Sequence, residues 1–175
     1  MPVRFRPQAP NQAADRVASS ARMPPLKLVL DTNVVLDWLV FEDAGVEPLR
    51  RGIEERRIVV ITYAPALEEL ERVLGYPQLK VDPQTRAAVL DAYRATASIA
   101  TVPEGYSTEH LMLPTGFPRC RDPDDEHFLA LAHHAAADAL VSKDRAVLKL
   151  RKRARKFGVR ILDVRQLSEL AQPSE

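Results

Sequence analysis

The chain has 175 residues, a formal net charge of +1 at pH 7 and a single cysteine. A domain of this length buries about 70% of the surface of its unfolded chain, so it needs no disulfide, and one cysteine excludes an internal one. No apolar run approaches the ~20 residues that cross a bilayer, and the N-terminus lacks the apolar segment of a secretory signal. We therefore expect one soluble, cytoplasmic domain with no membrane contact.

The charge is unevenly distributed along the chain. Residues 143–160 contain nine Lys or Arg and one acid, Asp144, which gives a local charge of +8 and leaves −7 for the remainder. This distribution argues against a protein that coats nucleic acid with its whole surface, but it permits one that binds a phosphate backbone along one edge. A solvated helix face is the alternative interpretation of such a run.

The two ends of the chain differ from its centre. Residues 1–25 are rich in Pro, Ala, Arg, Ser and Gln, so they predict a disordered N-terminal arm. Met23 lies immediately before the first predicted strand, and the sequence does not decide whether translation begins at Met1 or there. The folded domain is expected at 26–171, followed by a tail at 172–175.

The first predicted strand ends on an acid. The residues 28–30 form a continuous apolar run, which is typical of a strand buried on both faces. Asp31 follows it directly. Because the carboxyl ends of parallel strands face the crevice in which ligands bind, Asp31 is a candidate site residue, although it is also placed to cap the helix that follows.

Helices and strands alternate through the rest of the chain. Segment 103–120 has no clear period, and a connection of this length is more often functional than idle. The alternation predicts a three-layer α/β/α sandwich with a central, mostly parallel sheet of four to five strands. Further strands are expected at 58–62, 98–102, 139–142 and 159–162, and helices at 34–41, 47–56, 65–74, 82–97, 122–136, 144–150 and 164–171.

Acids recur after several of these strands. Asp31 follows the first strand and Asp144 the fourth, and the helices after the second strand and the long connection contain Glu68, Glu69, Asp122, Asp124 and Asp125. Carboxylates gathered in one crevice raise one another's pKa, so a fold that collects them normally holds a cation. Oxygen ligands favour Mg²⁺ or Mn²⁺. The helix dipole alone also favours acids in a first turn, and helical spacing does not choose between Glu68 and Glu69.

Other candidate groups have simpler explanations. The four histidines and Cys120 lack the paired spacing of a zinc site, and the adjacent His133 and His134 face different directions. No Gly-rich phosphate loop follows a predicted strand, and Trp38 is expected in the core.

Four segments of the chain together resemble the PIN-domain nucleases. The resemblance covers 26–170 and is closest to the bacterial branch of toxin components from toxin-antitoxin systems. Any one motif is weak, but four in order make a fairly specific match. The segments are LVLDTNVVLDW at 28–38, ITYAPALEELERVL at 61–74, CRDPDDEHFLALA at 120–132 and LVSKDRAVL at 140–148.

The resemblance implies hydrolysis of RNA phosphodiester bonds with one or two Mg²⁺ or Mn²⁺ ions. By matching positions, it implies four acids that are both catalytic and metal-binding, and one further metal-site acid of this branch: Asp31, Glu69, Asp125 and Asp144, with Asp122 as the addition. Asn33 and Ser142 match the supporting polar residues, and Thr62 stands where relatives often carry Ser.

The resemblance also implies partners. The protein would be an RNA-cleaving toxin held silent by a cognate antitoxin, and relatives often form homodimers. Two alternatives remain open: a non-catalytic RNA- or protein-binding module of the same fold, and a metal-dependent phosphatase that acts on small substrates. The cations expected to bind the RNA backbone are Lys143, Arg145, Lys149, Arg151, Lys152, Arg153, Arg155 and Lys156.

Overall fold

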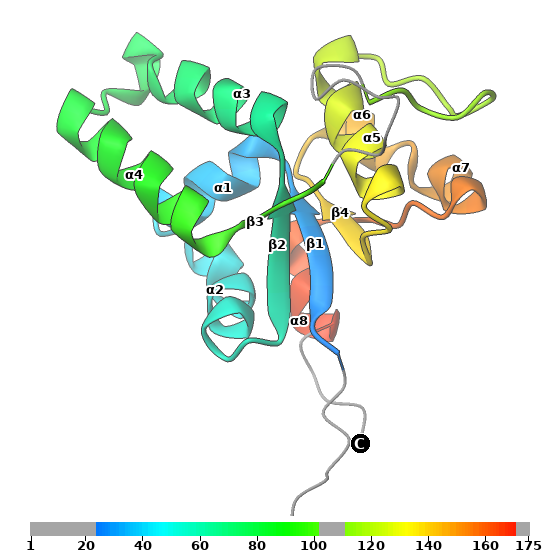
Figure 1. Ribbon diagram of the computed structural model, residues 1–175, viewed down its shortest axis with the longest axis horizontal. Coiled ribbons are helices and arrows are strands. Elements are labelled where there is room, and N and C mark those ends of the chain that lie inside the picture. The colour runs from blue at the N-terminus through cyan, green and yellow to red at the C-terminus, as the bar shows by residue number, and fades with distance from the viewer. Residues whose placement is uncertain (1–23, 102–110, 171–175) are drawn as a thin grey trace, which may run out of the picture.

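The computed structural model describes residues 24–101 and 111–170, in which five strands form one parallel sheet (Figure 1). Helices cover both faces of the sheet, so the predicted three-layer α/β/α architecture is confirmed. The strand order is β3-β2-β1-β4-β5, and every neighbouring pair is parallel. The strands are β1 (Leu26–Leu30), β2 (Ile58–Thr62), β3 (Ser98–Ile99), β4 (Ala139–Val141) and β5 (Ile161–Leu162).

The helices divide between the two faces of the sheet. The helices are α1 (Thr32–Leu39), α2 (Glu47–Glu54), α3 (Ala64–Leu74), α4 (Pro83–Thr96), α5 (Glu126–His134), α6 (Arg145–Leu148), α7 (Arg151–Ala154) and α8 (Leu167–Leu170). Helices α1, α2, α4 and α8 pack on one face of the sheet, and α5 to α7 pack on the other. Helix α3 contributes to both cores. Short 3₁₀ turns join them: η1 (Ala44–Val46), η2 (Pro77–Leu79), η3 (Pro123–Asp125), η4 (Arg155–Phe157) and η5 (Val164–Gln166).

Strand β1 is buried on both faces, as its continuous apolar run predicts. Leu28 and Leu30 belong to the core under α1, α2 and α4, whereas Val29 belongs to the core under α5 to α7. The side chains alternate between the faces because successive residues of a strand point to opposite sides. The sheet therefore rests on two separate hydrophobic layers.

Several predicted elements differ in detail from the structure. The strand expected at 98–102 ends at Ile99, whose exposed edge position offers little surface to pack against, and residue 102 lies outside the described residues. The helix expected at 122–136 begins as the turn η3, because Asp122 caps a tight turn that starts at Pro123, which has no amide donor. The helix expected at 144–150 is shorter, Arg145–Leu148, and the helix expected at 164–171 is divided into a turn and a helix, Val164–Gln166 and Leu167–Leu170. The strand expected at 159–162 begins at Ile161.

Several sequence predictions lie wholly or partly outside the described residues. These are most of the N-terminal arm, 102–110 of the long connection with His110, and the tail at 172–175. Residues 111–120 of the connection contain no helix or strand. No helix within the described ranges has the length and hydropathy that a bilayer span requires.

The strand order determines where a crevice forms. The chain passes from β1 to β2 and β3 on one side, then returns to place β4 on the other side of β1. Connections that leave β1 and β4 therefore diverge to opposite faces, α1 to one and α6 to the other. Ligands of open parallel sheets bind at such switch points, beyond the carboxyl ends of the strands. Here the switch lies beside Asp31 and Ser142.

Candidate active site

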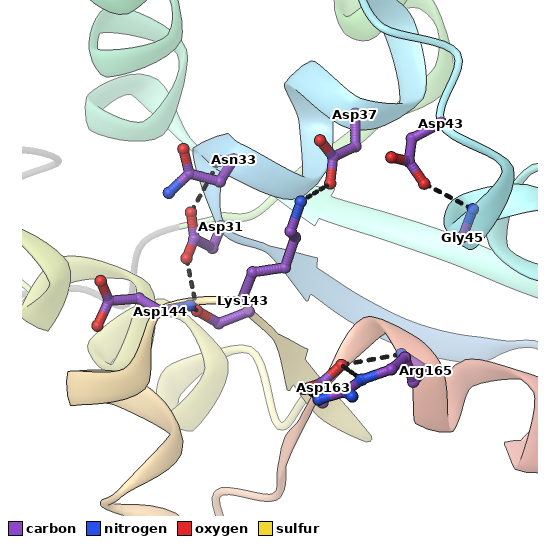
Figure 2. A network of polar contacts seen from close by, with 10 residues as sticks. Asp31, Asn33, Asp37, Asp43, Gly45, Lys143, Asp144, Asp163 and Arg165 are labelled. Carbon is purple, nitrogen blue, oxygen red and sulfur yellow. Dashed lines mark hydrogen bonds and ion pairs between the residues drawn. The ribbon is translucent and has the colours of Figure 1, made fainter.

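Asp31 lies at the switch point and is almost completely buried, with 3% of its surface exposed. Its Oδ1 accepts a hydrogen bond of 2.8 Å from the backbone amide of Asn33, which caps α1 (Figure 2). Its Oδ2 accepts a bond of 2.5 Å from the hydroxyl of Ser142, which follows β4. The cap and a role in the crevice are therefore compatible for Asp31.

The surroundings of Asp31 disfavour its charge. Burial raises the pKa of the carboxyl, the hydrogen bonds from Ser142 and Asn33 oppose that rise, and the negative charges of Glu69 and Asp144 add to it. The net result is a raised pKa. Asp31 therefore lies in a crevice in which the neighbouring charges have the same sign as its own.

Glu69 faces the same crevice from α3, whereas its neighbour Glu68 is exposed. Its Oε1 accepts a 2.7 Å bond from the Thr32 hydroxyl, and its Oε2 lies 2.7 Å from Nε2 of His127. Burial alone raises the pKa of Glu69, but the bonds from His127 and Thr32 outweigh burial, and the pKa is lowered. The structure thus brings Glu69, and not Glu68, next to Asp31.

The pKa of Asp125 is affected by all the other predicted acids. It is half-buried at the end of η3, and burial raises its pKa to about 7 together with the charges of Asp31, Asp144, Asp122 and Glu69. Asp122 itself is exposed, and its Oδ1 accepts a bond from the amide of Asp124, which caps η3. The charges of the other four acids predicted from the sequence therefore all reach Asp125. We call Asp31, Glu69, Asp122, Asp125 and Asp144 the acid cluster.

Ser142 connects two members of the acid cluster. Its side chain is fully buried, its hydroxyl donates to Asp31, and the same oxygen accepts a 3.0 Å bond from the backbone amide of Asp144. Asp144 in turn caps α6, because its Oδ1 accepts bonds from the amides of Ala146 and Val147. The end of β4 is thereby fixed against the end of β1.

The sequence analysis assigned no function to two residues that lie at the site. Asp37 on α1 is 8% exposed, and its Oδ2 pairs at 2.5 Å with the ammonium group of Lys143, which extends away from Asp144 toward α1 (Figure 2). His127 binds Glu69, and its ring packs against Tyr63 and Phe128. The signal for Asp37 is an acid inside an apolar helix, four residues after Asn33 on the same face.

Only part of the basic segment 143–160 lies at the site. Lys143 and Arg145 line a hollow together with Asp144. Arg151 is half-buried near Asp163, and its charge helps to lower the pKa of that acid. The other cations predicted to bind RNA are exposed on α7 and its flanking residues: Lys149, Lys152, Arg153, Arg155 and Lys156.

Three members of the acid cluster, Asp31, Glu69 and Asp125, line a hollow of about 590 Å³ that opens to solvent. We call this the acid hollow. Asp31 and Asn33 line it from α1, Glu69 and Val73 from α3, and Asp125 from η3, and the turn η2 closes its far side. The acids are therefore accessible to a ligand that enters between α1, α3 and η3.

The acid cluster fits a hard divalent cation by its chemistry. Its potential ligand atoms are all carboxylate oxygens, and burial together with the charges of the other acids raises the pKa of Asp125. Within the described ranges, no three His, Cys, Asp or Glu side chains are grouped closely enough to hold a metal ion between them. Mg²⁺ usually needs only one or two direct carboxylates because it keeps several waters, so the residues fit such an ion.

A comparison with protein families agrees with this geometry. A family model described as PIN domain matches residues 27–146, from β1 to the start of α6, and this range contains the whole acid cluster. No curated protein matches the chain significantly. PIN domains are generally metal-dependent nucleases that use divalent ions, so the match indicates a nuclease-like function. Because the match spans more than half of the chain, this protein belongs to the PIN-domain family.

Proposed function

We propose that the protein is a Mg²⁺- or Mn²⁺-dependent endoribonuclease that hydrolyses RNA phosphodiester bonds at the acid cluster. One observation carries the proposal: Asp31, Glu69 and Asp125, from three separate parts of the chain, line one hollow, where burial and the charges of the other acids raise the pKa of Asp125 to about 7. Gathering like charges costs stability, and a bound cation removes that cost. A phosphate backbone, which is itself anionic, also needs such a cation to approach carboxylates.

The residues that would hold one or two ions are Asp31, Glu69, Asp125 and Asp144, with Asp122 at the edge of the group. Asp125 and Asp144 are the most available, because both oxygens of Asp31 and both oxygens of Glu69 already accept hydrogen bonds. When bound, the ion would polarise the scissile phosphate and lower the pKa of an attacking water.

The protein's own residues hold the acids in position. Ser142 and the Asn33 amide orient Asp31, and Thr32 and His127 orient Glu69. These bonds keep the two buried carboxylates from rotating, so the crevice retains its shape before a substrate enters. Arg145, beside Asp144, would hold the RNA backbone, and Lys143 would do so by exchanging Asp37 for a phosphate, both through contacts that weaken with salt.

We further propose that the enzyme is the toxin of a type II toxin-antitoxin pair in the cytoplasm. The motif at 120–132, with its Arg-Asp-Pro-x-Asp pattern, supports this branch of the family. A cognate antitoxin would inhibit cleavage by covering the acid hollow. Expression of the chain alone should arrest growth of a bacterial host, and Asp31→Asn should remove the arrest. Normal growth with soluble, cleavage-competent protein would contradict the toxin role and leave the nuclease proposal intact.

A non-catalytic binding module of the same fold is the second candidate. The observation in its favour is that Asp31 and Glu69 are fully hydrogen-bonded by protein groups, and that no three metal-binding side chains converge in the described part of the chain. A site of this kind would bind RNA or a protein partner without cutting. The two candidates differ in one measurable respect, which is cleavage.

The test is a cleavage assay with purified full-length protein. Single-stranded RNA is incubated with Mg²⁺ or Mn²⁺, with and without EDTA, and the products are separated by length. Cleavage that needs the ion and disappears in EDTA supports the nuclease. Binding without cleavage in either ion supports the binding module. Hydrolysis of p-nitrophenyl phosphate with intact RNA would instead indicate a phosphatase for small substrates.

A further inference from the structure

One ion pair joins the segment after β4 to helix α1. The Nζ of Lys143 lies 2.5 Å from Oδ2 of Asp37, although the two residues are 106 positions apart (Figure 2). Asp37 is 8% exposed, whereas the lysine side chain is 47% exposed. The buried acid on a helix therefore fixes the position of the long and flexible lysine side chain.

Asp37 occupies an unfavourable position for an acid. It follows Val34, Val35 and Leu36 on α1, all of which are buried. A buried carboxylate loses its hydration, so it needs a partner of opposite charge. Among the described residues, Lys143 is the one partner of the Asp37 carboxylate. Because apolar residues in place of a buried ion pair often leave a fold equally stable, stability alone does not account for this pair.

Lys143 has a second carboxylate beside it. Asp144 is the next residue, and it lines the same hollow as Lys143 and Asp37. Its Oδ1 caps α6, but its Oδ2 accepts no hydrogen bond from the described part of the chain. The charge of Asp144 also helps to raise the pKa of Asp31 and of Asp125, so Asp144 acts on the rest of the acid cluster. An ammonium that was not paired with Asp37 would be attracted to this oxygen.

We propose that Asp37 is a positioning residue for the acid cluster. It holds the Lys143 ammonium against α1, away from Asp144, and thereby leaves Oδ2 of Asp144 open to a divalent cation. An ammonium and a divalent ion repel each other, so they compete for a single carboxylate oxygen. The inference rests on the proposed function, because it assumes that the acid cluster binds such an ion.

The test measures Mn²⁺ binding in the absence of RNA. Metal-free, full-length protein is titrated with Mn²⁺, and electron paramagnetic resonance reports the concentration of free ion. Asp37→Asn keeps the shape of the side chain but removes its charge. It should raise the Kd for Mn²⁺ about fivefold, the upper range for an ion pair at a partly exposed site. Adding Lys143→Met to this variant should return the Kd to within about twofold of the unaltered chain, because the competing ammonium is gone.

A double-mutant cycle separates this role from the simple loss of a negative charge. Lys143→Met should change the Kd much more in the Asp37→Asn chain than in the unaltered chain, because only there does the ammonium reach Asp144. Arg145 lines the same hollow, and Arg145→Met should change the Kd by the same factor in both chains. If Asp37 acts only through its own charge, both cycles are additive. As a control, Asp163→Asn releases a cation outside the acid cluster and should leave the Kd unchanged.

Nuclear magnetic resonance tests the unaltered chain directly. In protein with isotope-labelled lysine, the ammonium signal that Lys143→Met removes should stay unchanged when Mg²⁺ is added, since ammonium and ion occupy different carboxylates. A signal that Mg²⁺ displaces, an unchanged Kd in Asp37→Asn, or an additive cycle for Lys143 would each overturn the proposal. Absence of Mn²⁺ binding by the unaltered chain would contradict the proposed metal site as well, whereas an unchanged Kd in Asp37→Asn would contradict the positioning role alone.

Discussion

Two strands of the sheet end on an aspartate that caps the next element, but their surroundings differ. Asp31 follows β1 and caps α1, and Asp163 follows β5 and caps η5, where it forms a capping box with Gln166. Asp163 also accepts bonds to both of its oxygens from Arg165, at 3.2 and 2.9 Å. Figure 2 shows the two acids in one view, the first beside Asp144 and the second beside its own arginine.

The difference lies in how each charge is balanced. Hydrogen bonds from Arg165 lower the pKa of Asp163, whereas burial and the charges of Glu69 and Asp144 raise the pKa of Asp31 despite the bonds that Asp31 accepts. Position after a strand is therefore not sufficient evidence of a functional acid. An acid that is surrounded by other acids, with no Lys or Arg paired to it, is the stronger candidate for a residue of a cation-binding site.

The largest expected effect is on catalysis. Asp31→Asn should abolish Mg²⁺-dependent RNA cleavage, because it removes a carboxylate from the acid cluster. The fold should persist, because the oxygen of Asn caps a helix as well as that of Asp, and the Asn amide nitrogen, in the place of Oδ2, can donate to the Ser142 oxygen. Cleavage assays and circular dichroism of the purified variant measure the two effects.

Asp163→Asn is the matched control for this substitution. It changes an aspartate in the same local position, and it should leave cleavage unchanged, because Asp163 is neutralised by Arg165 and lies outside the acid cluster. Undiminished cleavage by the Asp31 variant, or an equal loss in both variants, would falsify the distinction between the two strand ends.

Metal binding should stabilise the protein through the acid cluster. If Mg²⁺ binds the folded state only, a concentration of 100 times Kd adds about 2.7 kcal/mol to the free energy of unfolding. We expect Mg²⁺ to raise the Tm of the unaltered chain and of Asp163→Asn, and to raise that of Asp125→Asn much less. Equal shifts in all three proteins would place the ion elsewhere.

The pH dependence of metal-free protein should also distinguish the two kinds of acid. The pKa of Asp125 is about 7 in the folded protein and near 3.8 in an ordinary environment. The folded state therefore binds more protons across this window, and the free energy of unfolding falls as pH rises through it. Asp163 acts in the opposite sense, because its lowered pKa adds stability that is lost as pH falls through its acid range.

Thermal denaturation in EDTA at a series of pH values tests this difference. Asp125→Asn should flatten the decline of Tm between about pH 4 and pH 7, whereas Asp163→Asn should leave that decline in place and alter only the acid side of the profile. A decline that persists unchanged in the Asp125 variant would contradict its high pKa.

The smallest expected effect is on the cap at the end of β5. Asp163→Ala removes the acceptor for the backbone amide of Arg165 and should lower the free energy of unfolding by about 1 kcal/mol. Arg165→Ala should have less effect, because its side chain is 87% exposed and solvent screens the ion pair. Urea denaturation of the two variants gives the comparison, and a larger loss for the arginine variant would contradict it.

Much of the fold could be predicted from local patterns. The continuous run 28–30 identified a strand buried on both faces, and the alternation of helices and strands identified the parallel sheet with helices on both sides. The acids at strand ends could be located because parallel strands bring their carboxyl ends to one edge. Element boundaries were less predictable, since Pro123 and its cap convert the start of a helix into a turn.

The partners of the site residues could not be predicted, because they depend on contacts between distant segments. The sequence contains both Asp37 and Lys143, but only the sheet order brings β4 beside β1 and so places that lysine against α1. The same holds for His127, which meets Glu69 across two helices. The separation of the lysine from most of the basic segment also follows from tertiary structure, because α7 turns away toward Asp163.

The bond between Ser142 and Asp31 has a consequence for the timing of synthesis. Its two residues are 111 positions apart, and Asp144 follows only after β4 has been made. A chain that emerges from its N-terminus therefore presents Asp31 and Glu69 long before their later neighbours exist. The crevice can be completed only after most of the domain has left the ribosome.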